Sequence, residues 1–328
     1  MAAVPVPPRV RELLARHGLA EVPAQRVAVG DGEIWRVGPL PGSTVAPGWR
    51  ALRVWPDGVA DRASVDTRIT WLDQLAADGL SVPAPLRDRS GQVLMRGADA
   101  SGAYAGLLSC WVPGRILFAA LRPVHLHRIG RLLARLHASA ERLAARGEIR
   151  IDRTHGIPLA DWAAGRLPAS PTCPPRLRAA VVRTCARLQA RQAAWPRSAG
   201  HWGYLHGDLH PWNLLHRRGQ VGVIDFGDSG WGWWAQDFAS VLQWLQQPLP
   251  GWHDHRAVYP ALRDALFDGY TSLRPLPPDL LAWLDDLLML RRLGTLQWMV
   301  DDWPRADHRP WGPAFLEDLG CALQADGA

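Results

Sequence analysis

The sequence changes character at Pro113-Gly114, and this change restricts the fold more than any other feature. Before it, short runs of β-branched and aromatic residues alternate with Gly, Pro and one helical segment, whereas amphipathic helical segments dominate after it. The 328 residues are enough for two such parts. We therefore predict an α+β protein with a strand-rich part over residues 1–111, a connection at 112–115 and a mainly helical part over 116–328.

Apolar periodicity and turn residues place the expected elements. Strands separated by turn residues, which suggest an antiparallel meander, are expected at 26–29, 34–37, 51–55, 92–95 and 107–112. Helices are expected at 9–20, 62–78, 125–146, 176–194, 235–246, 256–270, 279–300 and 313–325. Residues 166–176 are rich in Pro and are expected to form a loop.

The charged residues do not indicate a nucleic-acid partner. All 37 basic residues are arginine and the net charge is +6, but the arginines are scattered and interleaved with acids. The four cysteines are far apart, which gives no metal or disulfide pattern. No apolar stretch approaches about 18 residues, and the first residues lack a signal-peptide pattern. We expect a cytoplasmic protein with no membrane or nucleic-acid partner, and nothing in the sequence indicates its oligomeric state.

One segment, residues 204–228, is dense in side chains that carry out chemistry. Gly207 and Pro211 exclude a regular helix in its first half, which is therefore expected to be a loop. Its second half predicts a β-hairpin with strands at 214–216 and 221–226.

Three polar side chains of this segment suit phosphoryl transfer. Asn213 enters the first hairpin strand and Asp225 ends the second, so an amide oxygen and a carboxylate oxygen are expected side by side. Such oxygens suit Mg²⁺, which keeps several waters. Asp208 is a separate carboxylate, five residues before Asn213, that can receive a hydroxyl proton. A metal site for a triphosphate and a nearby base are the parts that phosphoryl transfer needs.

Two motifs of the segment resemble the catalytic and metal loops of the protein-kinase-like phosphotransferases. They are His206-x-Asp208-x4-Asn213 and Ile224-Asp225-Phe226-Gly227. With the later Asp237-Phe238-Ala239, they are similar to the aminoglycoside phosphotransferase and choline kinase family, closest to its bacterial stress-response-kinase-type and homoserine-kinase-type proteins. The resemblance covers most of the chain, although only residues 204–239 match specifically. It implies a two-lobed fold with an antiparallel-sheet N-lobe and a helical C-lobe.

The resemblance also implies a role for each matching residue of the segment. Asp208 becomes the catalytic base, and Asn213 and Asp225 become the Mg²⁺ ligands. His206 and Asp237 become structural supports of the loop.

ATP or GTP is implied as the phosphoryl donor, bound by residues of the N-lobe. These are the turn glycines, the residue at the position of the strand lysine, and the hinge backbone: Gly30, Gly32, Arg53, Cys110, Trp111 and Val112.

The sequence departs from the family where a lysine pairs with a glutamate. Arg53 stands at the lysine position, and an arginine can hold phosphate bidentately but is bulkier. Arg68 stands where the glutamate is expected, and Asp66 is the nearest acid upstream. Either Asp66 substitutes for the glutamate, or the register differs, or nucleotide binding is weakened.

The tryptophans divide between core and substrate contact. Aromatic faces bind cations, so Trp212 and Trp231, with the nearby Asp228, are candidate substrate contacts. Trp244, Trp283 and Trp298 are expected in the core because they fall in helical patterns; for Trp212 and residues 231–234 core packing also stays open.

We predict an ATP- or GTP-dependent phosphotransferase that moves the γ-phosphoryl group to a hydroxyl of a small molecule or of a protein Ser or Thr. Two alternatives stay open. The first is a non-catalytic nucleotide-binding pseudokinase, because of Arg53 and Arg68. The second is a metal-dependent phosphohydrolase, although the segment lacks the further carboxylates and histidines of a two-metal site.

Overall fold

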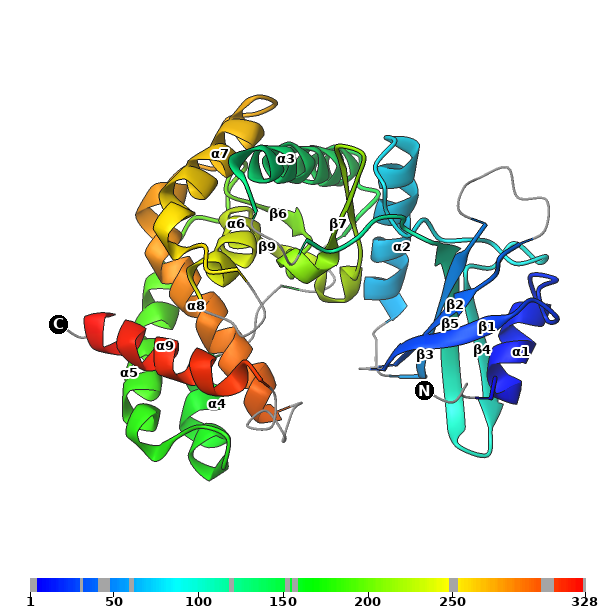
Figure 1. Cartoon of the computed structure of the whole chain (residues 1–328), viewed down its shortest axis with the longest axis horizontal. Coiled ribbons are helices and arrows are strands. Elements are labelled where there is room, and N and C mark those ends of the chain that lie inside the picture. Colours follow the sequence, from blue (N-terminus) through cyan, green and yellow to red (C-terminus); the bar gives the residue numbers. More distant parts are fainter. Residues whose placement is uncertain are drawn as a thin grey trace. The chain divides into compact units, whose positions relative to one another are not determined.

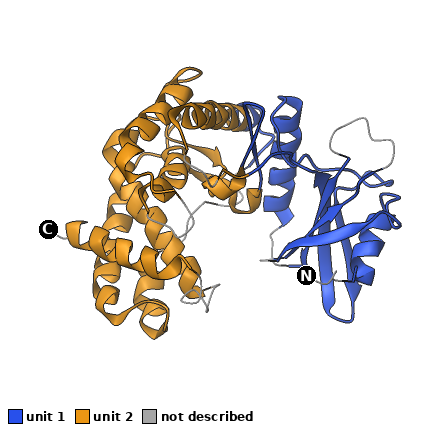
Figure 2. Ribbon diagram, in the orientation of Figure 1, with its two compact units in different colours: residues 1–115, 142–152, 215–224 blue, residues 116–141, 153–214, 225–328 orange. Residues whose placement is uncertain are grey.

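The structure is a computed structural model of the chain that describes residues 5–29, 32–40, 48–58, 62–117, 121–150, 154, 159–247, 253–301 and 310–326. Gly30, one of the predicted nucleotide-binding residues, lies outside the described residues. The chain forms two compact units (Figure 2). Unit 1 comprises Met1–Arg115, Arg142–Asp152 and Leu215–Ile224, and unit 2 comprises Ile116–Glu141, Arg153–Leu214 and Asp225–Ala328.

Unit 1 is built on an antiparallel sheet with the strand order β1-β2-β3-β5-β4 (Figure 1). The strands are β1 (Ala24–Val29), β2 (Glu33–Val37), β3 (Arg50–Pro56), β4 (Leu94–Asp99) and β5 (Gly102–Cys110). Strand β4 extends four residues beyond its predicted end and β5 begins five residues before its predicted start, because pairing continues through the polar end of β4 to the turn. Gly97 permits this, since a Cβ there would lie 2.5 Å from the hydroxyl oxygen of Tyr104.

Helix α1 (Pro8–Ala15) covers one face of the sheet (Figure 1). It buries three side chains in a cluster with strand residues of that face: Val10, Leu13, Leu14, Trp35, Val37, Leu52, Val54, Met95, Tyr104 and Leu108. Full burial of one such aliphatic side chain contributes about 1.5–3 kcal/mol. The helix ends five residues before the predicted end because the chain turns at Gly18, whose φ is +73°.

Helix α2 (Arg62–Ala77) covers the opposite face, where Val65 and Ile69 pack against Leu107 of β5. Arg53 lies opposite Leu107 in the register of β3 and β5. Because residues directly opposite in an antiparallel pair share a face, the Arg53 side chain leaves the sheet on the side that α2 covers.

A second hairpin follows the functional segment, as predicted. Its strands are β7 (Leu214–Arg217) and β8 (Gln220–Val223). Arg218 and Gly219 form its turn with φ values of +46° and +81°, the signature of a type I′ turn. Strand β8 ends at Val223, earlier than the predicted residue 226, so Asp225 lies on the following loop.

Unit 2 is mainly helical, and the helices predicted in this region are confirmed. They are α3 (Pro123–Ala145, whose last turn belongs to unit 1), α5 (Pro175–Ala193), α6 (Ala235–Leu242), α7 (Tyr259–Thr271), α8 (Leu280–Asp301) and α9 (Gly312–Asp326). A helix that the sequence analysis did not predict, α4 (Leu159–Gly165), joins α5, α8 and α9 around one apolar core. The short 3₁₀ helices are η1 (Leu167–Ala169), η2 (Pro211–Asn213), η3 (Phe226–Asp228), η4 (Gln243–Gln246) and η5 (Arg256–Val258).

Helices α3 and α7 cross at glycines. A Cβ on Gly130 of α3 would lie 2.1 Å from the carbonyl oxygen of Leu266, and one on Gly269 of α7 would lie 2.0 Å from that of His127. The two backbones therefore touch, which fixes α3 and α7 to each other.

A two-stranded ribbon in unit 2 positions the functional segment, and the sequence analysis did not predict its pairing. Strand β6 (Trp202–Leu205) pairs antiparallel with β9 (Gly230–Trp233), with Leu205 opposite Gly230. The loop that leaves β6 and the loop that enters β9 therefore meet at the same end of the ribbon.

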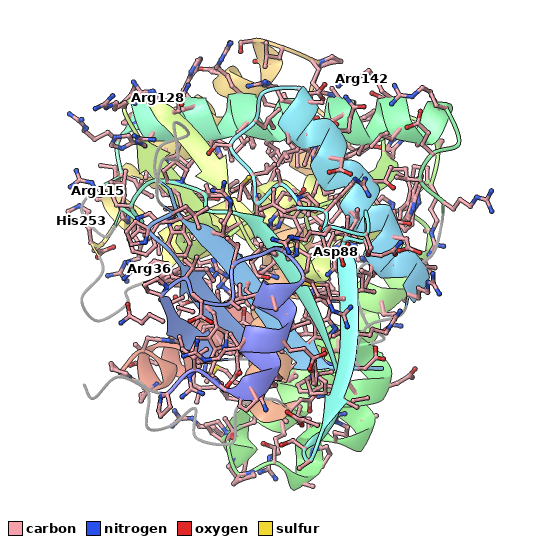
Figure 3. The ribbon with its side chains drawn as sticks, turned by 90° about the vertical axis from the view of Figure 1, so that its right-hand side faces the viewer. Arg36, Asp88, Arg115, Arg128, Arg142 and His253 are labelled. Carbon is pink, nitrogen blue, oxygen red and sulfur yellow. The ribbon has the colours of Figure 1, made fainter. Side chains whose placement is uncertain are left out.

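Two arginines of unit 1 contact neighbours within that unit. In unit 1, Arg142 pairs with Asp78 at 2.6 Å, and the Arg36 guanidinium lies 4.7 Å from the ring centre of Trp49 (Figure 3).

Among the described residues, no helix combines the length and the apolar character that crossing a membrane requires.

Candidate active site

Residues 206–213, which the resemblance implies to be catalytic and which are called the catalytic loop here, follow β6 and end in η2. Gly207 has a φ of +82°, a backbone conformation that L residues rarely adopt. Pro211 occupies the first position of η2, where its missing N–H is not needed. These local features place Asp208 and Asn213 on one turn.

Asp237, predicted to support the loop, lies in the first turn of α6 and has no exposed surface. Its Oδ1 accepts the N–H of Gly207 at 2.9 Å, and its Oδ2 accepts the N–H of His206 at 3.1 Å. Burial by itself would raise the pKa of Asp237, but hydrogen bonds from His137 and the loop backbone outweigh it and hold that pKa below its usual value. Asp237 thus holds the loop backbone as a buried, ionised carboxylate.

His137 of α3 completes this contact from the other side. Its Nε2 lies 3.3 Å from Asp237 Oδ2, and its Nδ1 lies 3.0 Å from the hydroxyl of Tyr270. Burial lowers the pKa of His137, so the ring is neutral. Because a carboxylate only accepts, Nε2 carries the proton and Nδ1 accepts the Tyr270 hydroxyl.

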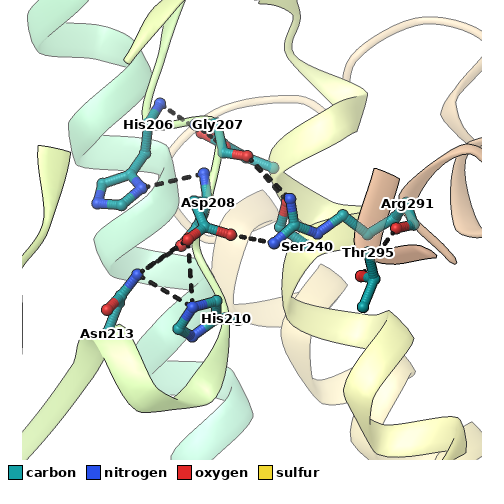
Figure 4. Close-up of polar contacts among 9 residues, drawn as sticks. His206, Gly207, Asp208, His210, Asn213, Ser240, Arg291 and Thr295 are labelled. Atoms are coloured by element: carbon teal, nitrogen blue, oxygen red, sulfur yellow. Dashed lines mark hydrogen bonds and ion pairs between the residues drawn. The ribbon is translucent and has the colours of Figure 1, made fainter. Parts of the chain in front are cut away.

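Asp208, the predicted base, has polar partners on both carboxylate oxygens (Figure 4). Its Oδ2 lies 3.2 Å from His210 Nε2 and 3.4 Å from Asn213 Nδ2, and its Oδ1 accepts from the Arg291 guanidinium. Burial alone would raise the pKa of Asp208, but Arg291 and His210 hold it well below its usual range. The carboxylate is therefore ionised at neutral pH, as a proton acceptor must be.

Arg291 is a site residue that the sequence analysis missed. It lies on α8, 83 positions from Asp208 in the sequence. The available signal was the pair Arg291-Arg292 inside an apolar run of that helix. The sequence does not reveal which loop such an arginine meets.

His206, the other predicted support, is completely buried and joins two loops. Its Nδ1 accepts the backbone N–H of Asp208 at 3.3 Å, and its ring centre lies 4.6 Å from that of Phe226. Phe226 directly follows Asp225, so His206 links the catalytic loop to the loop of the second predicted metal ligand.

The predicted metal ligands, Asn213 and Asp225, provide oxygen donors. The Nδ2 of Asn213 contacts Asp208 and His210, while no hydrogen bond among the described residues uses its Oδ1. Asp225 is exposed and has a φ of +60°. Among the described residues, no group of three or more His, Cys, Asp or Glu could hold a metal. An amide oxygen and a carboxylate fit a hard cation whose other ligands are water and phosphate oxygens.

The described nucleotide-binding candidates belong to unit 1, and some of their groups have structural tasks. A Cβ on Gly32 would lie 2.4 Å from the carbonyl oxygen of Val54, so the missing side chain lets Gly32 itself lie directly against β3. The N–H of Cys110 donates to the carbonyl of Ala84 at 2.8 Å, so it is already used. Beyond Cys110, Trp111 is half-buried and Val112 is buried.

Asp66 is not placed to replace the missing glutamate. It is exposed on α2, and its ion pair among the described residues is with Arg62 of the same helix, at 3.8 Å. Arg68 is half-buried on α2. Of the options left by the sequence, substitution by Asp66 gains no support from these contacts, and the three options stay predictions.

The candidate substrate contacts lie in different surroundings. Trp212 is half-buried, and its ring centre lies 5.5 Å from that of His210 and 4.9 Å from that of Trp244. Trp231 is half-buried on β9, and Asp228 is exposed at the end of η3. Trp212 is thus the candidate that adjoins the partners of Asp208.

Comparison with known proteins gives a consistent family match. Residues 43–281 match the model of the phosphotransferase enzyme family, APH. A homoserine kinase of Gluconobacter oxydans is 31% identical over 242 residues, which cover 71% of this chain and 69% of that protein. An uncharacterized protein of Deinococcus radiodurans is 32% identical over 247 residues, covering 74% of this chain and 68% of that protein.

Solved structures share the fold. A microcompartment-associated aminopropanol kinase superposes with a TM-score of 0.75 at 20% identity, covering 96% of this chain and 94% of that chain. An amicoumacin kinase in complex with AMP-PNP, Ca²⁺ and Ami gives 0.72 at 18% identity, with the same coverage. The predicted protein-kinase-like α+β fold is confirmed.

Proposed function

This chain belongs to the phosphotransferase enzyme family, and we propose that it is an ATP-dependent kinase that phosphorylates a hydroxyl group of a small amino alcohol. The observation that carries the proposal is the contact between Asp208 and Asn213 on one loop, whose backbone is held by the buried carboxylate of Asp237. An ionised carboxylate beside an amide with a free oxygen supplies a proton acceptor and a metal ligand at one place.

In the proposed reaction, Asp208 hydrogen-bonds the acceptor hydroxyl and orients its oxygen. The bond between the γ-phosphorus and the bridging oxygen of ATP breaks as the acceptor oxygen bonds to that phosphorus. The hydroxyl proton passes to Asp208, and ADP leaves. Asn213 and Asp225 would hold Mg²⁺, which offsets the charge of the triphosphate when bound.

On the nucleotide side, Arg53 is proposed to bind the phosphates, because its side chain leaves β3 on the face expected of the family's lysine. Gly32, Trp111 and Val112 are proposed to contact the nucleotide, with the backbone N–H of Cys110 removed from that set.

One relative and one structural neighbour support this acceptor class. One is named a homoserine kinase and one an aminopropanol kinase, and both names denote molecules with an amine and a hydroxyl. Trp212, next to His210, offers an aromatic face for such an amine, with Trp231 and Asp228 as further proposed contacts.

The test is transfer of label from [γ-³²P]ATP with Mg²⁺ to L-homoserine, aminopropanol, an aminoglycoside and a Ser/Thr-containing protein, each assayed separately. We expect transfer to an amino alcohol. Asp208→Asn is expected to lower kcat by about 10²–10⁴-fold, while thermal-shift titration still detects ATP binding.

Two results would contradict the proposal. Full transfer by Asp208→Asn would remove Asp208 as the proton acceptor. Transfer to the protein substrate alone would replace the small-molecule acceptor by protein Ser or Thr.

A further inference from the structure

Two helices of unit 2 contact the backbone of the same residue of the catalytic loop, Gly207. The N–H of Gly207 donates to Asp237 on α6, while its carbonyl oxygen lies 3.5 Å from Arg291 Nη1 on α8. The other terminal nitrogen of Arg291, Nη2, donates to Asp208 Oδ1 (Figure 4). Arg291 therefore contacts both the loop backbone and the proposed proton acceptor.

Packing alone does not explain an arginine at this position of α8. The helix around it is apolar: Leu287, Leu288, Met289 and Leu293 are buried. The Arg291 side chain is 22% exposed, and its Nε is buried with no hydrogen-bond partner among the described residues. An unsatisfied buried donor costs about 1–3 kcal/mol. An apolar side chain would avoid this cost, so the contact with Asp208 is the feature that accounts for the arginine.

We propose that Arg291 is a positioning residue for phosphoryl transfer: it holds Oδ1 of Asp208 and thereby directs Oδ2 to the acceptor hydroxyl. The inference rests on the proposed function. It assigns different roles to the two carboxylate oxygens of Asp208: Oδ1 is held by Arg291, and Oδ2 accepts the proton of the hydroxyl.

The geometry of Asn213 supports this division. Asp208 Oδ2 lies 3.4 Å from Asn213 Nδ2 and 3.2 Å from His210 Nε2, so it is the oxygen on the side of the proposed metal ligand. Transfer requires reacting atoms about 3–3.5 Å apart and aligned, and a displacement of about 1 Å can cost about 10²-fold in rate. Without Arg291, the carboxylate keeps contacts at Oδ2 alone, from His210 and Asn213, so Oδ1 is released and the direction of Oδ2 is no longer fixed from both sides.

The chain offers a matched control in the next residue. Arg292 is on the same helix, and it contacts Asp318 at 3.5 Å and Gln246 at 2.8 Å. We compare Arg291→Met, Arg291→Lys and Arg292→Met by kcat and KM, measured with ATP, Mg²⁺ and the acceptor that the label-transfer assay finds. The rate of ATP hydrolysis in water is measured for the same three variants.

Arg291→Met is expected to lower kcat by about 10²-fold, with the KM for ATP unchanged. Arg291→Lys is expected to recover part of kcat, because one ammonium keeps the charge but not the two-point contact. Arg292→Met is expected to retain the wild-type kcat.

Chemical rescue separates positioning from general stability. In Arg291→Ala, added guanidinium is expected to raise kcat, whereas urea of the same shape without charge is not. A general loss of stability would not respond selectively to guanidinium.

A crystal structure of Arg291→Met, or of Arg291→Lys if the first does not fold, gives a reading independent of turnover. We expect the Asp208 carboxylate to be rotated from its wild-type direction. An unchanged direction, or an Arg291→Met kcat equal to that of Arg292→Met, overturns the inference. Full activity of Asp208→Asn would instead overturn the proposed function, so the two failures are distinguishable.

Discussion

The buried brace of unit 2 and the sheet of unit 1 position functional side chains by different means. The buried brace is Asp237, His137 and Tyr270, all without exposed surface, and it holds the catalytic loop through hydrogen bonds. In unit 1, the half-buried Arg53 is placed by strand register. Replacing one residue of the brace leaves several buried polar groups without hydrogen-bond partners. Replacing Arg53 removes only the contacts that Arg53 itself makes.

Asp237→Leu is the strongest test of this difference. It leaves the N–H groups of His206 and Gly207 and the Nε2–H of His137 without their acceptor. The free energy of unfolding is expected to fall by about 3–5 kcal/mol, measured by urea denaturation. Asp264→Leu, an exposed acid of α7, is the control and should change it by less than about 0.5 kcal/mol. Equal effects of the two would mean that the brace does not hold the loop.

His137→Phe is expected to have the next largest effect. The new ring keeps the shape, but it removes a donor to Asp237 and leaves the Tyr270 hydroxyl without an acceptor. We expect a loss of about 1–3 kcal/mol in the free energy of unfolding. Combined with Asp237→Leu, the loss should be smaller than the sum, because both remove the same hydrogen bond. Strict additivity would show that the two residues act independently.

Arg53→Met tests the sheet side. If this side chain binds the phosphates of ATP, its loss should raise the KM for ATP by about tenfold and leave the free energy of unfolding nearly unchanged. Arg36→Met, on the neighbouring strand, is the matched control. A KM that stays at the wild-type value would place the phosphates elsewhere.

Tyr104 gives the smallest expected effect, visible through pH. Burial, together with the hydrogen bond to Glu12 at 2.7 Å, raises the pKa of Tyr104 to about 12. The unfolded pKa is about 10, so the folded state favours the protonated form. The contribution of this pKa difference to the free energy of unfolding is complete below a pH of about 10, and it is lost as the pH rises from about 10 through about 12.

The measurement is the alkaline titration of phenolate absorbance together with urea denaturation at several pH values. Tyr104→Phe should remove one late-titrating group and, below pH of about 10, about 1 kcal/mol of the free energy of unfolding. If the phenolate that Tyr104→Phe removes titrates at the ordinary value, the contact with Glu12 does not form in solution.

Local patterns predicted most elements, and the failures involve contacts between distant segments. The hairpin of β7 and β8 followed from its turn residues, whereas the pairing of β6 with β9 joins segments separated by that hairpin. Trp298, expected in the core, is 40% exposed and stacks on Trp311. Helical periodicity shows that a residue lies on the apolar face of a helix, but whether that face is buried depends on the element that packs against it.

The sequence by itself determined which side chains of residues 204–228 are the candidates for chemistry, because their types and spacing lie within one short segment. Asp208, Asn213 and Asp225 were singled out in this way, whereas Asp237 was implied by the family resemblance. Only the tertiary structure brought His137 and Arg291 to that segment, since α3 and α8 reach the catalytic loop through helix packing. Helix packing depends on how many apolar side chains from distant segments fit together, and the spacing of residues within one segment does not show this fit.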